Sequence, residues 1–122
     1  MIDVKKMAAQ GDVIFRLVDA VPEGYEPTKA DGELIVTHSE TGHHHVAKIP
    51  TGIEAVIFSS PKDTLVSYMK LPAKAPPIEI EHRRPWDTHE TLRLLTREVG
   101  ETIYEIRRQR EYAPEGWRRV ED

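Results

Sequence analysis

The sequence predicts an all-β fold, a single small antiparallel barrel or sandwich. Short segments rich in β-branched and aromatic residues recur along the chain, and glycine and proline mark the turns between them. No long amphipathic helical pattern interrupts this series. We expect one β-domain over residues 1–122, with a short polar lead at residues 1–10 and a tail at residues 113–122.

The N-terminal half is expected to form a strand, a surface loop and a hairpin. Residues 12–18 are rich in β-formers and predict the first strand. Residues 19–32 contain two prolines and two glycines, which favours a loop. Strands over residues 33–38 and 43–49, joined by a tight turn at residues 39–42, then predict the hairpin.

Three more strands and a proline-rich connector should follow. Strands are expected over residues 53–58 and 64–71, because turn residues bound both segments. Residues 72–77 hold three prolines, which excludes a central strand and indicates a connector or a protected edge. Isoleucine and glutamate alternate over residues 78–81, so a half-buried strand should deliver His82 to its end.

The C-terminal part begins with an expected loop at residues 83–88. Residues 89–99 fit either a helix or a strand, and we favour the strand. Residues 102–107 predict a final long strand. A turn at residues 113–117 should fold Trp117 back onto the body of the domain.

Composition narrows the class of protein. The absence of cysteine excludes disulfides and thiolate ligands, which leaves imidazole and carboxylate groups to bind any metal. No segment approaches the roughly 18 apolar residues of a membrane span, and no apolar signal core follows the first lysines, so we expect a cytoplasmic protein without a membrane role. A net charge of −4 argues against a general nucleic-acid binder, although nine of ten arginines follow residue 82.

The strongest functional signal is the consecutive run His43, His44 and His45. Side chains alternate along a strand, so His43 and His45 should share one face and His44 the other. Two imidazoles two residues apart can bind one metal ion. A solvated or merely packed histidine run is the competing interpretation, and the position inside a hairpin favours metal binding.

A third metal ligand has to come from elsewhere in the chain. The candidates, in order, are His89, His82, His38 and Glu40. Glu40 could be a ligand, a partner that orients an imidazole, or a general base on metal-bound water. The expected cofactor is a divalent zinc, iron or nickel ion.

Three motifs resemble a pattern in small uncharacterised bacterial and phage β-proteins. They are Gln10-Gly11-Asp12-Val13, Glu40-Thr41-Gly42-His43-His44-His45 and Arg108-Gln109-Arg110-Glu111-Tyr112. The resemblance spans most of the chain. It implies that Glu40, His43 and His45 form the principal motif and that His82 and His89 correspond to the later histidines, and it implies no particular activity.

The pair His43-x-His45 is also similar to the first motif of the cupin barrel. The glutamate expected shortly after that pair is absent, because Val46-Ala47-Lys48-Ile49 follows, and no second cupin motif is present. The likeness is therefore an analogy of architecture and transfers no reaction.

Two classes of function follow from these observations. The first is a cytoplasmic metal-binding β-barrel of unknown reaction, with metal-dependent hydrolysis or oxygenation of a small molecule as the reactions that such a site would suit. The second is a non-enzymatic phage or mobile-element binding module for a protein partner, or for single-stranded nucleic acid through Arg107, Arg108 and Arg110. A homo-oligomer is compatible with both.

Overall fold

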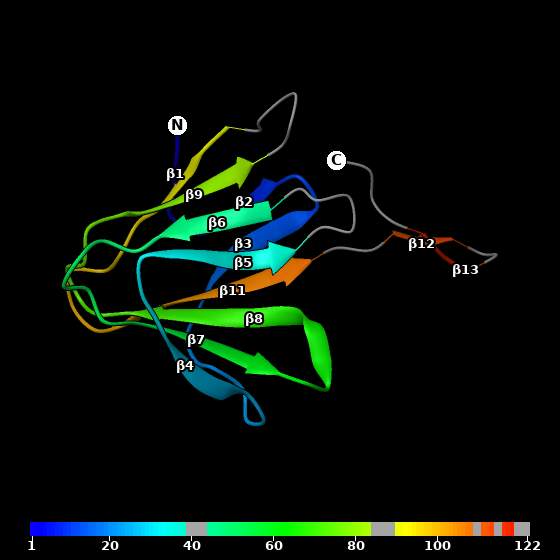
Figure 1. Ribbon diagram of the computed structural model, residues 1–122, viewed down its shortest axis with the longest axis horizontal. Helices are drawn as coiled ribbons and strands as arrows, with labels where there is room; N and C mark the ends of the chain where they lie inside the picture. Colours follow the sequence, from blue (N-terminus) through cyan, green and yellow to red (C-terminus); the bar gives the residue numbers. More distant parts are fainter. Residues whose placement is uncertain (39–43, 84–89, 109–110, 114–115, 119–122) are drawn as a thin grey trace.

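The chain folds into two facing β-sheets that do not close into a barrel (Figure 1). The computed structural model describes residues 1–38, 44–83, 90–108, 111–113 and 116–118, and these residues contain strands and turns but no helix, so none that could span a membrane. The all-β prediction is confirmed, and of the two expected architectures the sandwich is the one observed. The barrel favoured in the metal-binding hypothesis is wrong, because both sheets retain edge strands.

The five-stranded sheet has the order β1-β10-β9-β6-β5. Its strands are β1 (Ile2–Val4), β5 (Glu33–His38), β6 (His44–Lys48), β9 (Ile78–Arg83) and β10 (Leu92–Leu94). Neighbouring strands are antiparallel except β1 and β10, which are parallel. The expected hairpin is thus confirmed as the pair β5–β6, and its turn at residues 39–42 lies outside the described residues.

The six-stranded sheet has the order β2-β3-β11-β8-β7-β4, and all its pairs are antiparallel. Its strands are β2 (Met7–Gln10), β3 (Val13–Val18), β4 (Glu26–Ala30), β7 (Ala55–Ser60), β8 (Asp63–Leu71) and β11 (Thr102–Arg108). A separate two-stranded sheet pairs β12 (Glu111–Ala113) with β13 (Gly116–Arg118). The turn residues 114–115 and the side chain of Trp117 fall outside what the structure describes.

The core fills the space between the two sheets. Alternate residues of each strand point inward, because side chains alternate in direction along extended backbone. The largest fully buried apolar side chains come from both layers: Phe15, Met69, Leu71, Ile78, Ile80, Leu92, Leu94, Tyr104 and Ile106. Segments that the alternation identified, such as residues 78–81, therefore deliver their isoleucines to the interior as expected.

Two segments depart from the expectation. Residues 1–10 form β1 and β2 instead of a polar lead, because β1 adds to β10 and places Val4 in the core. Residues 19–32 are not all loop, because residues 26–30 form β4 on β7. β4 is an edge strand, where Pro27 and Lys29 are tolerated without breaking a ladder on both sides.

The ambiguous segment 89–99 contains a strand, as favoured, but β10 spans only three residues of it. The proline segment 72–77 remains outside the strands, as predicted. The last predicted strand is confirmed as β11, which lies between β3 and β8. Residues 84–88 of the expected loop are not among the described residues.

Tyr104 joins the two sheets through a buried hydroxyl. It is part of β11, yet its Oη lies 2.7 Å from the Leu95 carbonyl oxygen and 3.1 Å from that of Val4. Both acceptors belong to the β1–β10 edge of the opposite sheet, where the Leu95 amide also donates to the Val4 carbonyl. Burial raises the pKa of Tyr104 to about 12, so the hydroxyl keeps the proton that it donates.

Tyr104→Phe should lower the free energy of unfolding by about 1–2 kcal/mol, because the Leu95 carbonyl oxygen loses its hydroxyl donor while the ring still fills its space. Urea unfolding followed by circular dichroism would measure the change. Tyr25→Phe is the matched control, because the hydroxyl of Tyr25 donates to the partly buried side chain of Asp63 and makes no bond between the sheets among the described residues. An equal loss in both variants would contradict a special role for the bond between the sheets.

Candidate functional site

β6 begins, and β9 and β11 end, at the same end of the sandwich (Figure 1), and buried or partly buried polar side chains from these elements lie there. Five residues form this cluster, here called the histidine site: Gln10, Asp12, His45, His82 and Arg108. From the six-stranded sheet, β2 contributes Gln10, the β2–β3 turn contributes Asp12 and β11 contributes Arg108; β6 and β9 contribute the histidines from the other sheet. The site therefore lies between the two layers.

His45 and His82 are direct partners in the β6–β9 ladder. Their rings stack with centroids 4.0 Å apart and an angle of 14° between the planes. Each side chain is only 1% exposed. Two polar rings thus occupy positions that apolar side chains hold further along the same strands, such as Ala47 and Ile80.

Gln10 holds His45 through its side-chain amide. The Nε2 atom of Gln10 donates to the carbonyl oxygens of Ile80, at 2.9 Å, and Glu90, at 3.0 Å. Its Oε1 atom lies 2.9 Å from Nδ1 of His45. Every polar atom of this amide, which is 2% exposed, is therefore engaged.

Asp12 lies between His45 and Arg108. Its Oδ1 atom is 3.6 Å from Nε2 of His45, and its Oδ2 atom accepts a hydrogen bond of 3.3 Å from Nε of Arg108. A buried carboxylate beside an imidazole and a guanidinium is costly to desolvate, and such clusters gather at functional sites. The cluster can hold a cation or an imidazole in a fixed orientation.

The structure brings together only part of the predicted ligand set. His45 and His82 meet, whereas Glu40, His43 and His89 lie outside the described residues. Within the described ranges, no group of three or more histidine, aspartate or glutamate side chains is placed to hold a metal ion. The histidine that the structure places beside His45 is His82, which ranked below His89 among the candidates for a third metal ligand.

Gln10 and Asp12 were not among the site residues expected from the sequence, and Arg108 was expected only as a contact to single-stranded nucleic acid in the binding-module hypothesis. A signal was present, because they belong to the Gln-Gly-Asp-Val and Arg-Gln-Arg-Glu-Tyr motifs. One described residue of each motif, Asp12, Arg108 or His45, lies at the same place in the fold, although 96 positions separate Asp12 from Arg108. Arg108 therefore belongs to the histidine site. The neighbouring Arg107 instead donates to Glu105 on the opposite face of the sheet, and Arg110 lies outside the described residues.

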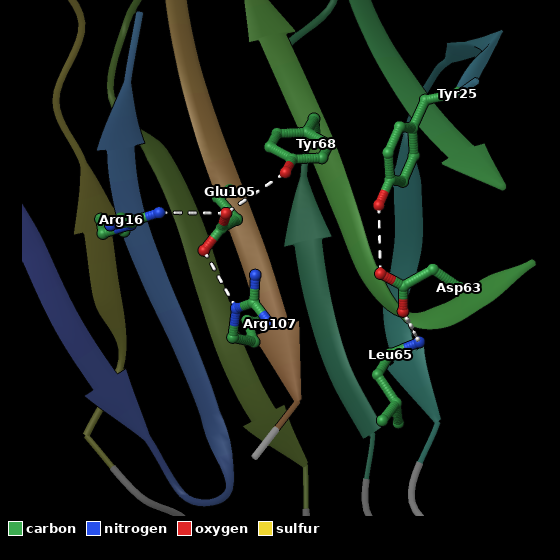
Figure 2. A network of polar contacts seen from close by, with 7 residues as sticks. All are labelled: Arg16, Tyr25, Asp63, Leu65, Tyr68, Glu105 and Arg107. Atoms are coloured by element: carbon green, nitrogen blue, oxygen red, sulfur yellow. Dashed lines mark hydrogen bonds and ion pairs between the residues drawn. The ribbon is translucent and has the colours of Figure 1, made fainter. Parts of the chain in front are cut away.

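Figure 2 shows a second polar network, on the outer face of the six-stranded sheet. Glu105, 5% exposed, accepts hydrogen bonds of 3.2 Å each from Arg16, Arg107 and Tyr68. Tyr25 meets the ring of Tyr68 edge-on, with centroids 5.0 Å apart.

The carboxylate of Glu105 therefore connects three side chains on the outer face of the six-stranded sheet. Burial opposes its charge, but the hydrogen bonds from Arg107 and Arg16 outweigh that effect and hold the pKa of Glu105 below its usual value of 4.5. Burial and the nearby carboxylate raise the pKa of Tyr68 to about 12. The Tyr68 ring also belongs to a small apolar cluster with Val66 and Ile103. This packing indicates that the polar network has a structural role.

Comparison with known proteins gives one match. A protein-family model described as "Domain of unknown function (DUF8820)" matches residues 9–109, a range that includes all five residues of the histidine site. No curated protein and no solved structure matches the chain.

The lowered pKa of Glu105 predicts a pH-dependent stability. The contribution of the carboxylate should be complete above its usual pKa of 4.5 and should be lost as the pH falls through the lower pKa of the folded state. Glu105→Gln should therefore destabilise the protein near pH 7 and much less near pH 2, measured by urea unfolding across that range. Exposed Glu101→Gln is the control, and a difference that does not shrink at low pH would refute this assignment.

Proposed function

The chain belongs to the DUF8820 family of domains of unknown function, and we propose that it binds one divalent metal ion at the histidine site. The observation that carries the proposal is the buried pair His45 and His82, which neighbouring strands bring together beside the carboxylate of Asp12. Neutral imidazole suits zinc, iron and nickel, and carboxylate oxygen commonly completes such sites. We place the protein in the cytoplasm, as its sequence led us to expect.

We propose the remaining ligands from the residues that precede His45 and Glu90 in the chain. His43 precedes His45 by two positions, so a continuation of β6 would direct both imidazoles to the same face. His89 is joined to Glu90, whose carbonyl oxygen accepts a hydrogen bond from the Gln10 amide that also holds His45. Both histidines are thus candidates for a third ligand, with Glu40 as a further ligand or a general base.

The reaction depends on how many positions the protein ligands fill. Three protein ligands would leave a position for water or substrate, which suits metal-assisted hydrolysis or oxygen chemistry on a small molecule. Four protein ligands would make the metal structural. The resemblance of the sequence motifs to small bacterial and phage β-proteins favours neither a catalytic nor a structural metal.

A second candidate function is a non-enzymatic binding module. It is supported by a groove of about 500 Å³ between β5 and the β7–β8 hairpin, lined by Leu34, Val36, Ile57 and Val66 among others. β5 ends the order of its sheet, so no described strand pairs with its outer side. Such an edge can accept an extended segment of a protein partner or of a second copy.

The metal proposal is tested by mass spectrometry of untagged protein after expression without added metal. We expect near-stoichiometric zinc, iron or nickel in the native chain and loss of that metal in the double variant His43→Ala/His45→Ala. His44→Ala is the matched control, because strand alternation predicts its side chain on the other face, and it should retain the metal.

Circular dichroism would confirm that the double variant remains folded. A native chain that carries no metal, and takes up none in titrations with zinc, iron and nickel, would reject the proposal. In that case the binding module becomes the better interpretation, and substitutions along the groove such as Ile57→Asp should be tested for loss of partner binding.

A further inference from the structure

We infer that Asp12 is a carboxylate ligand of the proposed metal ion and shares it with Nε2 of His45. The inference rests on the proposed function and adds a residue that the histidine motif did not contain. Three observations carry it: the hydrogen bonds that Gln10 makes at His45, the distance between the two donor atoms, and the contact that orients Asp12.

The tautomer of His45 follows from the bonds of Gln10. Carbonyl oxygens only accept hydrogen bonds, so the two contacts to Ile80 and Glu90 must come from the NH₂ group of Gln10. The amide oxygen of Gln10 then faces Nδ1 of His45 at 2.9 Å, and this nitrogen must carry a proton to donate. In the neutral ring the lone pair is therefore on Nε2, the nitrogen that faces Asp12.

The distance between Nε2 of His45 and Oδ1 of Asp12 is 3.6 Å. This is longer than the 2.7–3.2 Å typical of an N–H···O hydrogen bond. Two ligands bound at about 2.0–2.2 Å to one tetrahedral zinc ion are separated by roughly 3.3–3.6 Å. The two atoms are thus spaced as ligands of a common ion.

Arg108 orients the carboxylate for this role. Its Nε atom donates to Oδ2 of Asp12, which directs Oδ1 toward the imidazole. Gln10 does the same for His45, so each proposed ligand has its own partner, buried in the case of Gln10 and partly buried in the case of Arg108. Partners of this kind fix the geometry and basicity of metal ligands.

Among the described residues, the donor atoms that face each other are thus an imidazole nitrogen of His45 and a carboxylate oxygen of Asp12. Mixed imidazole and carboxylate donors occur in catalytic zinc sites and in non-haem iron oxygenases, where water or substrate occupies the other positions. The inference therefore favours a catalytic site over a closed structural one.

Calorimetric titration with zinc chloride tests the assignment of Asp12. Asp12→Asn preserves shape but removes the charge, and we expect it to weaken zinc binding at least about tenfold. Asp3→Asn is the matched control, because Asp3 pairs with Arg93 at the protein surface and should leave the affinity unchanged. Equal affinity in the native chain and Asp12→Asn would reject Asp12 as a ligand and leave the metal proposal intact.

A nuclear magnetic resonance measurement on the native chain requires no substitution. Before zinc is added, the ¹⁵N shifts of His45 should show a protonated Nδ1; with zinc, the Nε2 shift and the carboxylate ¹³C shift of Asp12 should both move. A proton on Nε2 alone, or an unmoved Asp12 carboxylate, would overturn the inference. Absence of binding to zinc, iron and nickel alike would instead overturn the proposed function and the inference together.

Discussion

The side-chain amide of Gln10 is the constraint on which the end of the sandwich depends. It extends from β2 in one sheet to a backbone carbonyl of β9 in the other, and it holds His45 of β6 through its oxygen. The same NH₂ group reaches the carbonyl oxygen of Glu90, at the end of the segment that leads to β10. One buried amide thereby sets the spacing of the sheets, the direction of an imidazole and the return of the chain. A shorter side chain could not make these three contacts from the same backbone position.

Local patterns in the sequence were sufficient for most of the strands. Turn residues bounded β3, β5, β6, β8 and β11, and alternation identified the inward isoleucines of β9. Local patterns failed for strands whose pairing partners lie far away in the sequence. Ile2–Val4 has too few residues to show periodicity, and it is a strand because β10 lies beside it. β4 contains Pro27, which argues against a strand until its position at a sheet edge is known.

The candidate site was predictable only in part, because some of its residues carry a local sequence signal and others are placed by long-range pairing. His45 stands in a conspicuous local run, so residue type and spacing were enough to select it. Asp12 and Gln10 belong to the Gln-Gly-Asp-Val motif, but that motif names no role for them, and their place beside the histidines depends on the register of β2, β3 and β11. The preference for His89 over His82 could not be resolved from spacing, whereas the direct pairing of His45 with His82 follows from the β6–β9 ladder.

The parallel pairing of β1 with β10 also has a consequence for how the molecule folds. It joins Ile2 to Leu92, so a loop of about 90 residues must close before this edge can form. The contacts of Gln10 with Ile80 and Glu90 span similar lengths of chain. Hairpins such as β7–β8 close short loops and can form early, whereas these long-range contacts are slow to form. The histidine site is therefore assembled among the last parts of the fold, after the local hairpins have provided the surfaces on which it is built.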